Sequence, residues 1–381
     1  MRAVVAMDSF KGSLSSFRAG CAVKEAILSL DRSAEVTVLP LADGGEGTVD
    51  ALSFGSGSAL TEVTVTGPTG KPVTARYCIL PDGITAVMEM AAAAGLTLVP
   101  PEDRDPMETT TYGVGEMIRH GIKTGCRRFI MGIGGSATND GGTGMLSALG
   151  YEFLDSRGTP VPLGGKGLEH LHAISADHVL PELRECSFRI ACDVTNPLCG
   201  ENGCSAVYGP QKGAAPHAIE KMDGWLRDYA EIARTVSDRA DPNHPGAGAA
   251  GGLGFAFLAF TSAVLESGIK IILDEIQLEQ HIRSADIIIT GEGRLDRQTV
   301  MGKAPAGVAA LAKAHGKPVV AFAGCITADA PICNSFGIDA FFPIVPGVVT
   351  AGEAMDPKTA YINLKNTAAQ VFRLINAVRG L

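Results

Sequence analysis

Short apolar runs alternate with helix-like segments at both ends of the chain, and this alternation limits the possible folds more than any other feature. Residues 2–7 and 35–41 are apolar runs of strand length, and residues 13–30 between them have helical periodicity. The same order returns near the C-terminus, with apolar runs at 287–290, 318–323 and 340–344. Such alternation predicts a parallel sheet with helices on both faces.

The middle of the chain has a different pattern. Three β-branched runs, at 61–66, 73–80 and 85–90, are separated by turns rich in Gly and Pro, which predicts an antiparallel meander. We therefore predict an α/β protein in which a doubly wound parallel, Rossmann-like sheet domain is interrupted by a second, mixed α/β domain. The first domain comprises residues 1–60 and 285–381 and the inserted one residues 61–284, in line with roughly 150 residues per domain.

Charge and hydropathy exclude two classes of partner. The chain has 32 Lys and Arg against 41 Asp and Glu, a net charge of −9, which argues against nucleic acid. No apolar stretch reaches the roughly 18 residues of a membrane helix, and the N-terminal apolar run is too short for a signal peptide. We expect a cytoplasmic protein with small-molecule substrates, and the sequence leaves its oligomeric state open.

Acidic, glycine-rich segments follow three of the predicted parallel strands. They are D-S-F-K-G at 8–12, A-D-G-G-E-G at 42–47 and G-E-G-R-L-D at 291–296. Ligands bind at the carboxyl ends of the strands in an open parallel sheet, so these segments should meet at one site. The alternative is that each is a tight turn with solvated carboxylates. Three such segments at strand ends favour the site.

The residue types in these segments suit phosphoryl transfer. Lys11 and Arg294 can neutralise phosphate oxygens. Together with Asp8 they are candidate catalytic residues. Since carboxylates can hold Mg²⁺ or accept a proton, the candidate metal ligands are Asp43, Glu46, Glu292 and Asp296. Asp193, directly after a predicted strand at 187–192, is a candidate general base and can also be a metal ligand, with a capped turn as the alternative. Which carboxylate is base and which is metal ligand stays open.

A second glycine-rich segment, G-I-G-G-S-A-T-N-D-G-G at 132–142, follows a predicted strand at 127–132. Its hydroxyls, amide and backbone N–H groups can form an anion site at the start of a helix. The candidate phosphate- or substrate-binding residues are Gly134, Gly135, Ser136, Thr138 and Asn139, with Lys212 and Lys303 as cations from other segments.

The segment at 132–142 also supports a rival function. It spells G-x-G-x-x-A, and Asp155 follows at about the 20-residue spacing of a dinucleotide fold, as in an NAD(P)-dependent dehydrogenase of a small hydroxy acid. Against this, Asn139 to Gly142 occupy the first turns of the required helix, where they are unfavourable. A non-catalytic binding protein is a third possibility, although a passive binder of anions has no need of clustered carboxylates.

The ordered set of motifs resembles the bacterial glycerate kinase family, of the glycerate 2-kinase type. The matching stretches span essentially the whole chain: D-S-F-K-G-S-L-S (8–15), L-A-D-G-G-E-G-T (41–48), G-I-G-G-S-A-T-N-D-G-G (132–142), A-C-D-V-T-N-P-L (191–198), Y-G-P-Q-K-G-A (208–214), G-A-A-G-G-L-G (248–254), T-G-E-G-R-L-D (290–296) and G-K-A-P (302–305). The resemblance implies ATP-dependent phosphorylation of D-glycerate, usually at the 2-hydroxyl, in a cleft between two α/β domains. With ATP as cofactor, Mg²⁺ would bridge its phosphate oxygens.

Overall fold

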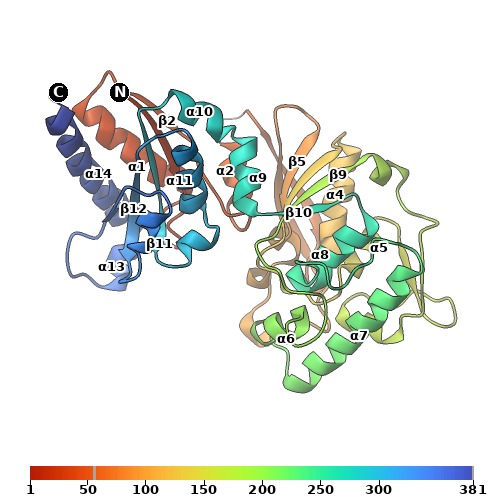
Figure 1. The fold of residues 1–381 in the computed structure, drawn as a ribbon. Coiled ribbons are helices and arrows are strands. Elements are labelled where there is room, and N and C mark those ends of the chain that lie inside the picture. Colours follow the sequence, from red (N-terminus) through yellow and green to blue (C-terminus); the bar gives the residue numbers. More distant parts are fainter. Residues whose placement is uncertain (55–56, 380–381) are drawn as a thin grey trace. The chain divides into compact units, whose positions relative to one another are not determined.

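The computed structural model describes residues 1–54 and 57–379. These form two compact units (Figure 1): unit 1 comprises Met1–Asp43, Asp50–Phe54 and Ile269–Leu381, and unit 2 comprises Gly44–Val49 and Gly55–Gly268. The domain boundaries predicted near residues 61 and 285 stay predictions. Residues 55–56 and 380–381, which the predicted domain ranges include, lie outside the described residues.

Unit 1 is built on a parallel five-stranded sheet with the strand order β13-β12-β11-β1-β2. Its strands are β1 (Arg2–Met7), β2 (Glu35–Val38), β11 (Ile287–Leu295), β12 (Val319–Ile326) and β13 (Ala340–Pro343). The chain runs outward from β1 to β2 in one direction and from β11 to β13 in the other. The topological switch point, where such sheets bind ligands, therefore lies between β1 and β11.

Helices cover both faces of this sheet, as the doubly wound prediction requires. Helices α1 (Ser16–Leu30) and α14 (Pro357–Arg379) pack together over one face, while α10 (Leu278–Ser284) and α11 (Ala304–Ala314) contact β1 and lie on the other (Figure 1). Helix α1 begins where the Ser15 hydroxyl accepts a hydrogen bond from the Arg18 N–H, at 3.3 Å. It buries Ala19, Val23 and Ile27 against the sheet.

Strand β11 is longer than the sequence suggested. The prediction ended it at residue 290 and placed G-E-G-R after the strand, which is wrong, because Glu292 and Arg294 continue the pairing with Ala323 and Cys325 of β12. Glycine makes this extension possible: a Cβ atom at Gly291 would lie 2.1 Å from the Phe322 carbonyl oxygen. The acidic and basic side chains are thus carried by a paired strand.

Unit 2 contains a mixed six-stranded sheet with the order β10-β9-β6-β5-β4-β3. The predicted meander is confirmed, since β3 (Ala59–Thr66), β4 (Pro72–Ile79) and β5 (Thr85–Glu89) pair antiparallel. The remaining strands, β6 (Arg128–Gly132), β9 (Ser187–Ala191) and β10 (Val264–Glu266), continue the sheet in parallel. A separate antiparallel pair joins β7 (Glu152–Leu154) to β8 (Ala173–Ser175).

The longer helices of unit 2 enclose an aromatic core. They are α4 (Tyr112–Lys123), α7 (Pro216–Arg234) and α8 (Ala249–Phe260). Tyr229 of α7 is buried against Phe153, Phe255 and Phe260. The α-helices of the described residues not yet named are α2 (Thr48–Ser53), α3 (Ala91–Ala94), α5 (Thr143–Ala148), α6 (Cys204–Tyr208), α9 (Gly268–Glu275), α12 (Ile332–Ser335) and α13 (Ala351–Met355). Among the described residues, no helix combines the length and apolar character needed to cross a membrane.

Candidate active site

A cavity of about 1000 Å³ lies in unit 1 at the carboxyl ends of the parallel strands. Residues far apart in the sequence line it together, as the strand-end argument predicts. Six of the sequence-predicted site residues are among them: Asp8, Lys11, Asp43, Glu292, Arg294 and Lys303. The cavity therefore combines three carboxylates with three cations at the switch point of the sheet.

Asp8 extends β1 directly beside Glu292 of β11. Its backbone N–H donates to the Gly291 carbonyl at 2.9 Å, and its Oδ1 accepts from the Ser9 N–H at 2.6 Å. The residue is only 5% exposed. Burial raises the pKa of Asp8 to about 7, and the neighbouring Asp43 carboxylate adds to this shift. Asp8 is therefore a carboxyl group that gains or loses its proton near neutral pH.

Lys11 reaches into the same cavity from the turn after β1. Its side chain is 72% exposed, and its Nζ lies 3.2 Å from Asp43 Oδ2. Partial burial alone would lower the pKa of Lys11, but the negative charges of Asp43, Asp8 and Glu292 outweigh it and raise the pKa. Lys11 is thus a permanent cation with room to bind an anionic ligand.

Glu292 is held in place by two partners. The Thr299 hydroxyl donates to its Oε1 at 2.6 Å, and Lys303 Nζ lies 3.4 Å from its Oε2. Burial raises the pKa of Glu292, although these two partners oppose the shift. Lys303 directly precedes α11, so it presents a cation from the helix start. Thr299 had no motif to mark it in the sequence.

Asp296 positions Arg294 and does not line the cavity. Its Oδ2 accepts from Arg294 at 2.8 Å, and its Oδ1 accepts from the Gln298 N–H at 2.8 Å. Burial opposes the shift, but these hydrogen bonds lower the pKa of Asp296. The Arg294 side chain is 58% exposed and stays available to a ligand.

The glycine-rich segment of unit 2 surrounds a buried lysine. Gly134 and Gly135 are exposed, whereas Ser136 is buried. Lys212 Nζ donates to Ser136 Oγ and to the Thr138 carbonyl, both at 2.7 Å. Burial lowers the pKa of Lys212 to about 8. The ammonium group is therefore held by neutral acceptors, an arrangement that an anionic ligand would stabilise.

Two fully buried polar atoms near this lysine, Thr138 Oγ1 and Asn139 Oδ1, have no hydrogen-bond partner within the described chain. The other end of the Asn139 amide donates to Ser205 Oγ at 2.9 Å. Buried polar atoms are nearly always satisfied in folded proteins. The unsatisfied pair therefore marks a place where a ligand or water completes the hydrogen bonding.

Asp140 anchors the segment, a role that the sequence did not indicate. Its buried carboxylate accepts from the Thr111 N–H at 2.7 Å, the Thr111 hydroxyl at 2.8 Å and the Gly142 N–H at 3.1 Å. Burial raises the pKa of Asp140. Helix α5 begins only at Thr143, so residues 139–142 precede the helix. The match to a dinucleotide fingerprint fails at this point, because the helix should begin at the end of the glycine motif.

The remaining predicted site residues, Asp193 and Glu46, belong to unit 2. Asp193 follows β9, is exposed, and accepts from the Gly268 N–H at 3.2 Å. Glu46 is exposed on a turn. Within residues 1–54 and 57–379, no group of three or more His, Cys, Asp or Glu side chains is arranged as a ready-made metal site. The metal role of the predicted carboxylates stays a prediction.

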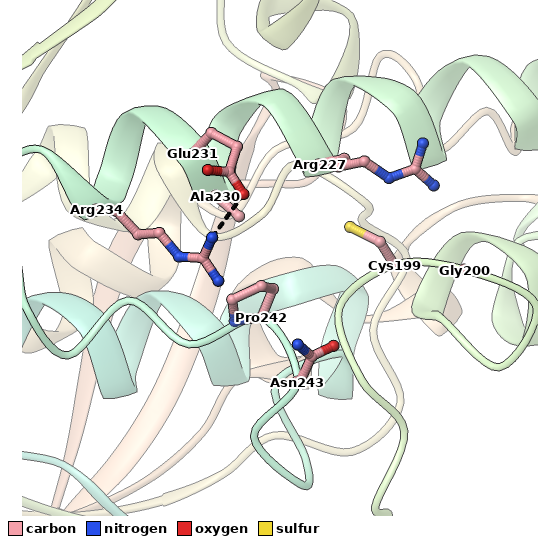
Figure 2. A pocket seen from close by; sticks show the side chains of 8 residues that line it. All are labelled: Cys199, Gly200, Arg227, Ala230, Glu231, Arg234, Pro242 and Asn243. Carbon is pink, nitrogen blue, oxygen red and sulfur yellow. Dashed lines mark hydrogen bonds and ion pairs between the residues drawn. The ribbon is translucent and has the colours of Figure 1, made fainter.

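A smaller hollow of about 340 Å³ lies beside α7 in unit 2 (Figure 2). Two arginines line it, but Arg234 pairs with Glu231 and Arg227 with Asp223, each at 2.7 Å. Burial raises the pKa of the Cys199 thiol there to about 12, so the thiol is not activated. None of the sequence-predicted site residues lines this hollow, and its charges are already neutralised.

Comparison with known proteins assigns the chain to a family. A model described as "Glycerate kinase family" matches residues 3–376. The chain belongs to the glycerate kinase family. It is 45% identical to "Glycerate kinase" of Haemophilus influenzae, over 98% of this chain and 99% of that protein. It is also 45% identical to "Glycerate 2-kinase" of Escherichia coli, over 96% of this chain and 95% of that protein.

Solved structures give the same result. The crystal structure of glycerate kinase 2 from Salmonella typhimurium LT2 matches with a TM-score of 0.92 and 44% identity, covering 100% of both chains. The resemblance noted in the sequence motifs and the predicted fold class are therefore confirmed. The residue roles are not assigned by these comparisons.

Proposed function

We propose that this protein is a glycerate kinase, which transfers the γ-phosphoryl group of ATP to D-glycerate, at the 2-hydroxyl. One observation carries the chemistry: the unit 1 cavity places Asp8, Lys11 and Arg294 together at the sheet's switch point. Family membership supplies the reaction class, and the Escherichia coli relative's name supports the 2-phosphorylated product. Small-molecule substrates follow from this activity, and the cytoplasmic location stays a prediction.

Cations in the cavity would bind the phosphates of ATP. Lys11 and Arg294 are more than half exposed, and Lys303 is about one-third exposed. In phosphoryl transfer the protein mainly positions the groups and neutralises charge on the transferred phosphoryl oxygens. Asp296 supports this function because its carboxylate accepts from the Arg294 guanidinium and so fixes its orientation. The other N–H groups of Arg294 can then donate to phosphate oxygens.

A carboxylate must take the proton of the attacking hydroxyl. Two candidates remain, Asp193 in unit 2 and Asp8 in unit 1. A general base works best with a pKa near the operating pH, and the Asp8 value of about 7 meets this condition. The argument for Asp193 as the general base is its place directly after β9, at the carboxyl end of a parallel strand. Substitution of each by Asn separates the two assignments.

Mg²⁺ fits the residues around Asp8. The three carboxylates Asp8, Asp43 and Glu292 repel one another enough to contribute to the raised pKa of Asp8, and a divalent cation would relieve this repulsion. Protein sites commonly hold Mg²⁺ by one or two carboxylates plus substrate phosphates, so no preformed cage is needed. Asp43 and Glu292, both in the cavity lining, would hold the ion, which when bound neutralises phosphate charge. Asp296, already engaged by Arg294, is less suited.

Glycerate would bind by its carboxylate at Lys212. Among the described residues, the two hydrogen-bond acceptors of the buried ammonium group are neutral, and Thr138 Oγ1 and Asn139 Oδ1 lack partners there. An incoming carboxylate would stabilise the charged form of Lys212, and the substrate hydroxyls can bond to the unsatisfied oxygens. Exposed Gly134 and Gly135 on the same segment leave the backbone accessible.

The activity is tested with purified protein, MgATP and D-glycerate. We expect ADP release that depends on glycerate, and a phosphoglycerate product whose ³¹P NMR spectrum identifies the 2-phosphate. 3-Hydroxypropanoate, which lacks the 2-hydroxyl, serves as the control acceptor and should cause no ADP release. Absence of glycerate-dependent ADP release, in protein that is folded by circular dichroism, would refute the kinase function.

A further inference from the structure

The unit 1 cavity is larger than the charged cluster needs, and its remaining wall is apolar. We propose that this apolar part binds the adenosine moiety of ATP, so that unit 1 alone holds the nucleotide. The inference rests on the proposed kinase function and adds the location of the base. The wall is formed by Ile344, Val345, Val348, Val349 and Met355, which follow β13.

Strand order separates the two ends of the cavity. The charged residues come from the ends of β2, β1 and β11, whereas the apolar segment follows β13 at the opposite edge of the sheet. Gly324 and Cys325 of β12 line the cavity between them. A ligand that spans this row needs a charged end and an apolar end. A nucleoside triphosphate has both, and glycerate, which is small and hydrophilic, has no apolar end.

The apolar wall is a formed structure that folds back over β1. Met355 lies so close to Gly12 that a Cβ atom at that glycine would be 2.8 Å from the Met355 Cε. Helix α13 is fixed by a capping box, in which the Thr350 hydroxyl accepts from the Glu353 N–H at 3.3 Å and Glu353 Oε2 accepts from the Thr350 N–H at 2.9 Å. The segment therefore closes the cavity from the turn after β1 to β13.

Ser13, on the turn after β1, adds a polar group to the cavity lining. The buried Ser13 Oγ lines the cavity and makes no hydrogen bond within the part of the chain that the structure describes. Ligand pockets typically combine an apolar lining with a few such groups, which fix the orientation of the ligand. Ser13 Oγ is suited to bond to the ribose or to a ring nitrogen of the base.

Cys325 provides a direct probe of occupancy. It is the one exposed residue of the nine free cysteines, and it pairs with Arg294 in the middle of the cavity. Iodoacetamide should therefore label it first, as read by peptide mass spectrometry. We expect AMP-PNP, ADP and adenosine to slow this labelling by roughly tenfold at ten times their Kd. D-glycerate should not protect it. Full-rate labelling in saturating AMP-PNP or adenosine would overturn the proposal.

A glycine on the wall allows the cavity to be filled by substitution. Gly347 lines the cavity, and a Cβ atom there would meet nothing within 4 Å, so Gly347→Trp adds a bulky side chain without displacing neighbours. The matched control is Gly224→Trp on α7, where a Cβ atom also meets nothing within 4 Å. We expect the Kd for mant-ADP to rise at least tenfold in Gly347→Trp, and to be unchanged in the control, with both melting temperatures preserved.

The outcomes separate this proposal from the kinase function itself. If wild-type protein phosphorylates glycerate while Gly347→Trp binds mant-ADP normally, the base lies elsewhere and the proposal is wrong, but the function stands. If wild-type protein forms no phosphoglycerate yet adenosine protects Cys325, the nucleotide site stands and the proposed acceptor is wrong.

Discussion

Replacing Asp8 by Asn should stabilise the protein above pH 7 and change it little in acid. With a pKa of about 7 in the folded chain and about 3.9 in the unfolded chain, Asp8 lowers the free energy of unfolding by about 4 kcal/mol at pH 8 and by about 1 kcal/mol at pH 4.5. Between the two pKa values the folded state keeps a proton that the unfolded state has lost, so stability falls as pH rises through this window. Asn has no such cost and can still accept from the Ser9 N–H.

The assay is scanning calorimetry of both proteins in metal-free buffer from pH 4.5 to 8. We expect Asp8→Asn to raise Tm at pH 8 by roughly 8–16 °C, since 1 kcal/mol moves Tm by about 2–4 °C in domains of 150–250 residues. Trp225, the single tryptophan, lies in unit 2, so its fluorescence follows that unit separately. The same variant should have lost most of its kinase activity.

The control is Glu35→Gln, which removes an exposed carboxylate of β2 in unit 1. Its effect on Tm should be small at every pH, because its ion pair with Arg2 is exposed and such pairs contribute about 0–1 kcal/mol. A stabilisation by Asp8→Asn that does not grow between pH 4.5 and pH 8 would refute the reasoning, as would a loss of stability at pH 8.

Three further predictions test the site assignments. Lys11→Ala should lower kcat by roughly 10²-fold, the effect of losing one preorganised charge. The Tm should be unchanged because the Lys11 side chain is 72% exposed. A near-normal kcat would show that Lys11 takes no part in the mechanism. If Asp193 is the general base, Asp193→Asn should abolish turnover in steady-state assays and leave mant-ADP binding intact. Titration with NAD, NADH, NADP and NADPH should give no saturable heat by calorimetry, because α5 begins only at Thr143 and not at the end of the glycine motif, as a dinucleotide site requires. Micromolar binding of any of the four would support the dehydrogenase alternative.

The strand pattern made much of unit 1 predictable. Residues 2–7 form β1 as expected, because a short apolar run next to an amphipathic helix has few alternatives to a buried parallel strand. Parallel strands share a carboxyl edge, so the meeting of Asp8, Lys11 and Arg294 followed from chain order alone. These predictions used local periodicity and one topological rule.

What the sequence could not show depends on tertiary contacts. G-E-G-R at 291–294 has turn composition, and only its pairing with β12 makes it a strand. The hydrogen bonds from Arg294 to Asp296 and from Thr299 to Glu292 depend on how residues 295–299 fold back. The apolar cavity wall at residues 344–355 carries no motif, since van der Waals contact with a ligand requires only apolar side chains in the right place.

The number of protons taken up when glycerate binds tests whether the glycerate carboxylate lies at Lys212. With a pKa of about 8, the buried ammonium group is mostly deprotonated at pH 8.5, and a bound carboxylate would raise the pKa and restore the charge. Glycerate binding should therefore take up roughly half a proton or more at pH 8.5 and almost none at pH 6.5, where the lysine is already charged. Calorimetric titration of D-glycerate in buffers of different ionisation enthalpy gives this number directly. Lys212→Met should remove the uptake, while Lys166→Met, at an exposed lysine of the same unit, should retain it. Binding without buffer dependence at pH 8.5 would place the glycerate carboxylate away from Lys212, because no ligand can charge a buried lysine without drawing a proton from solution.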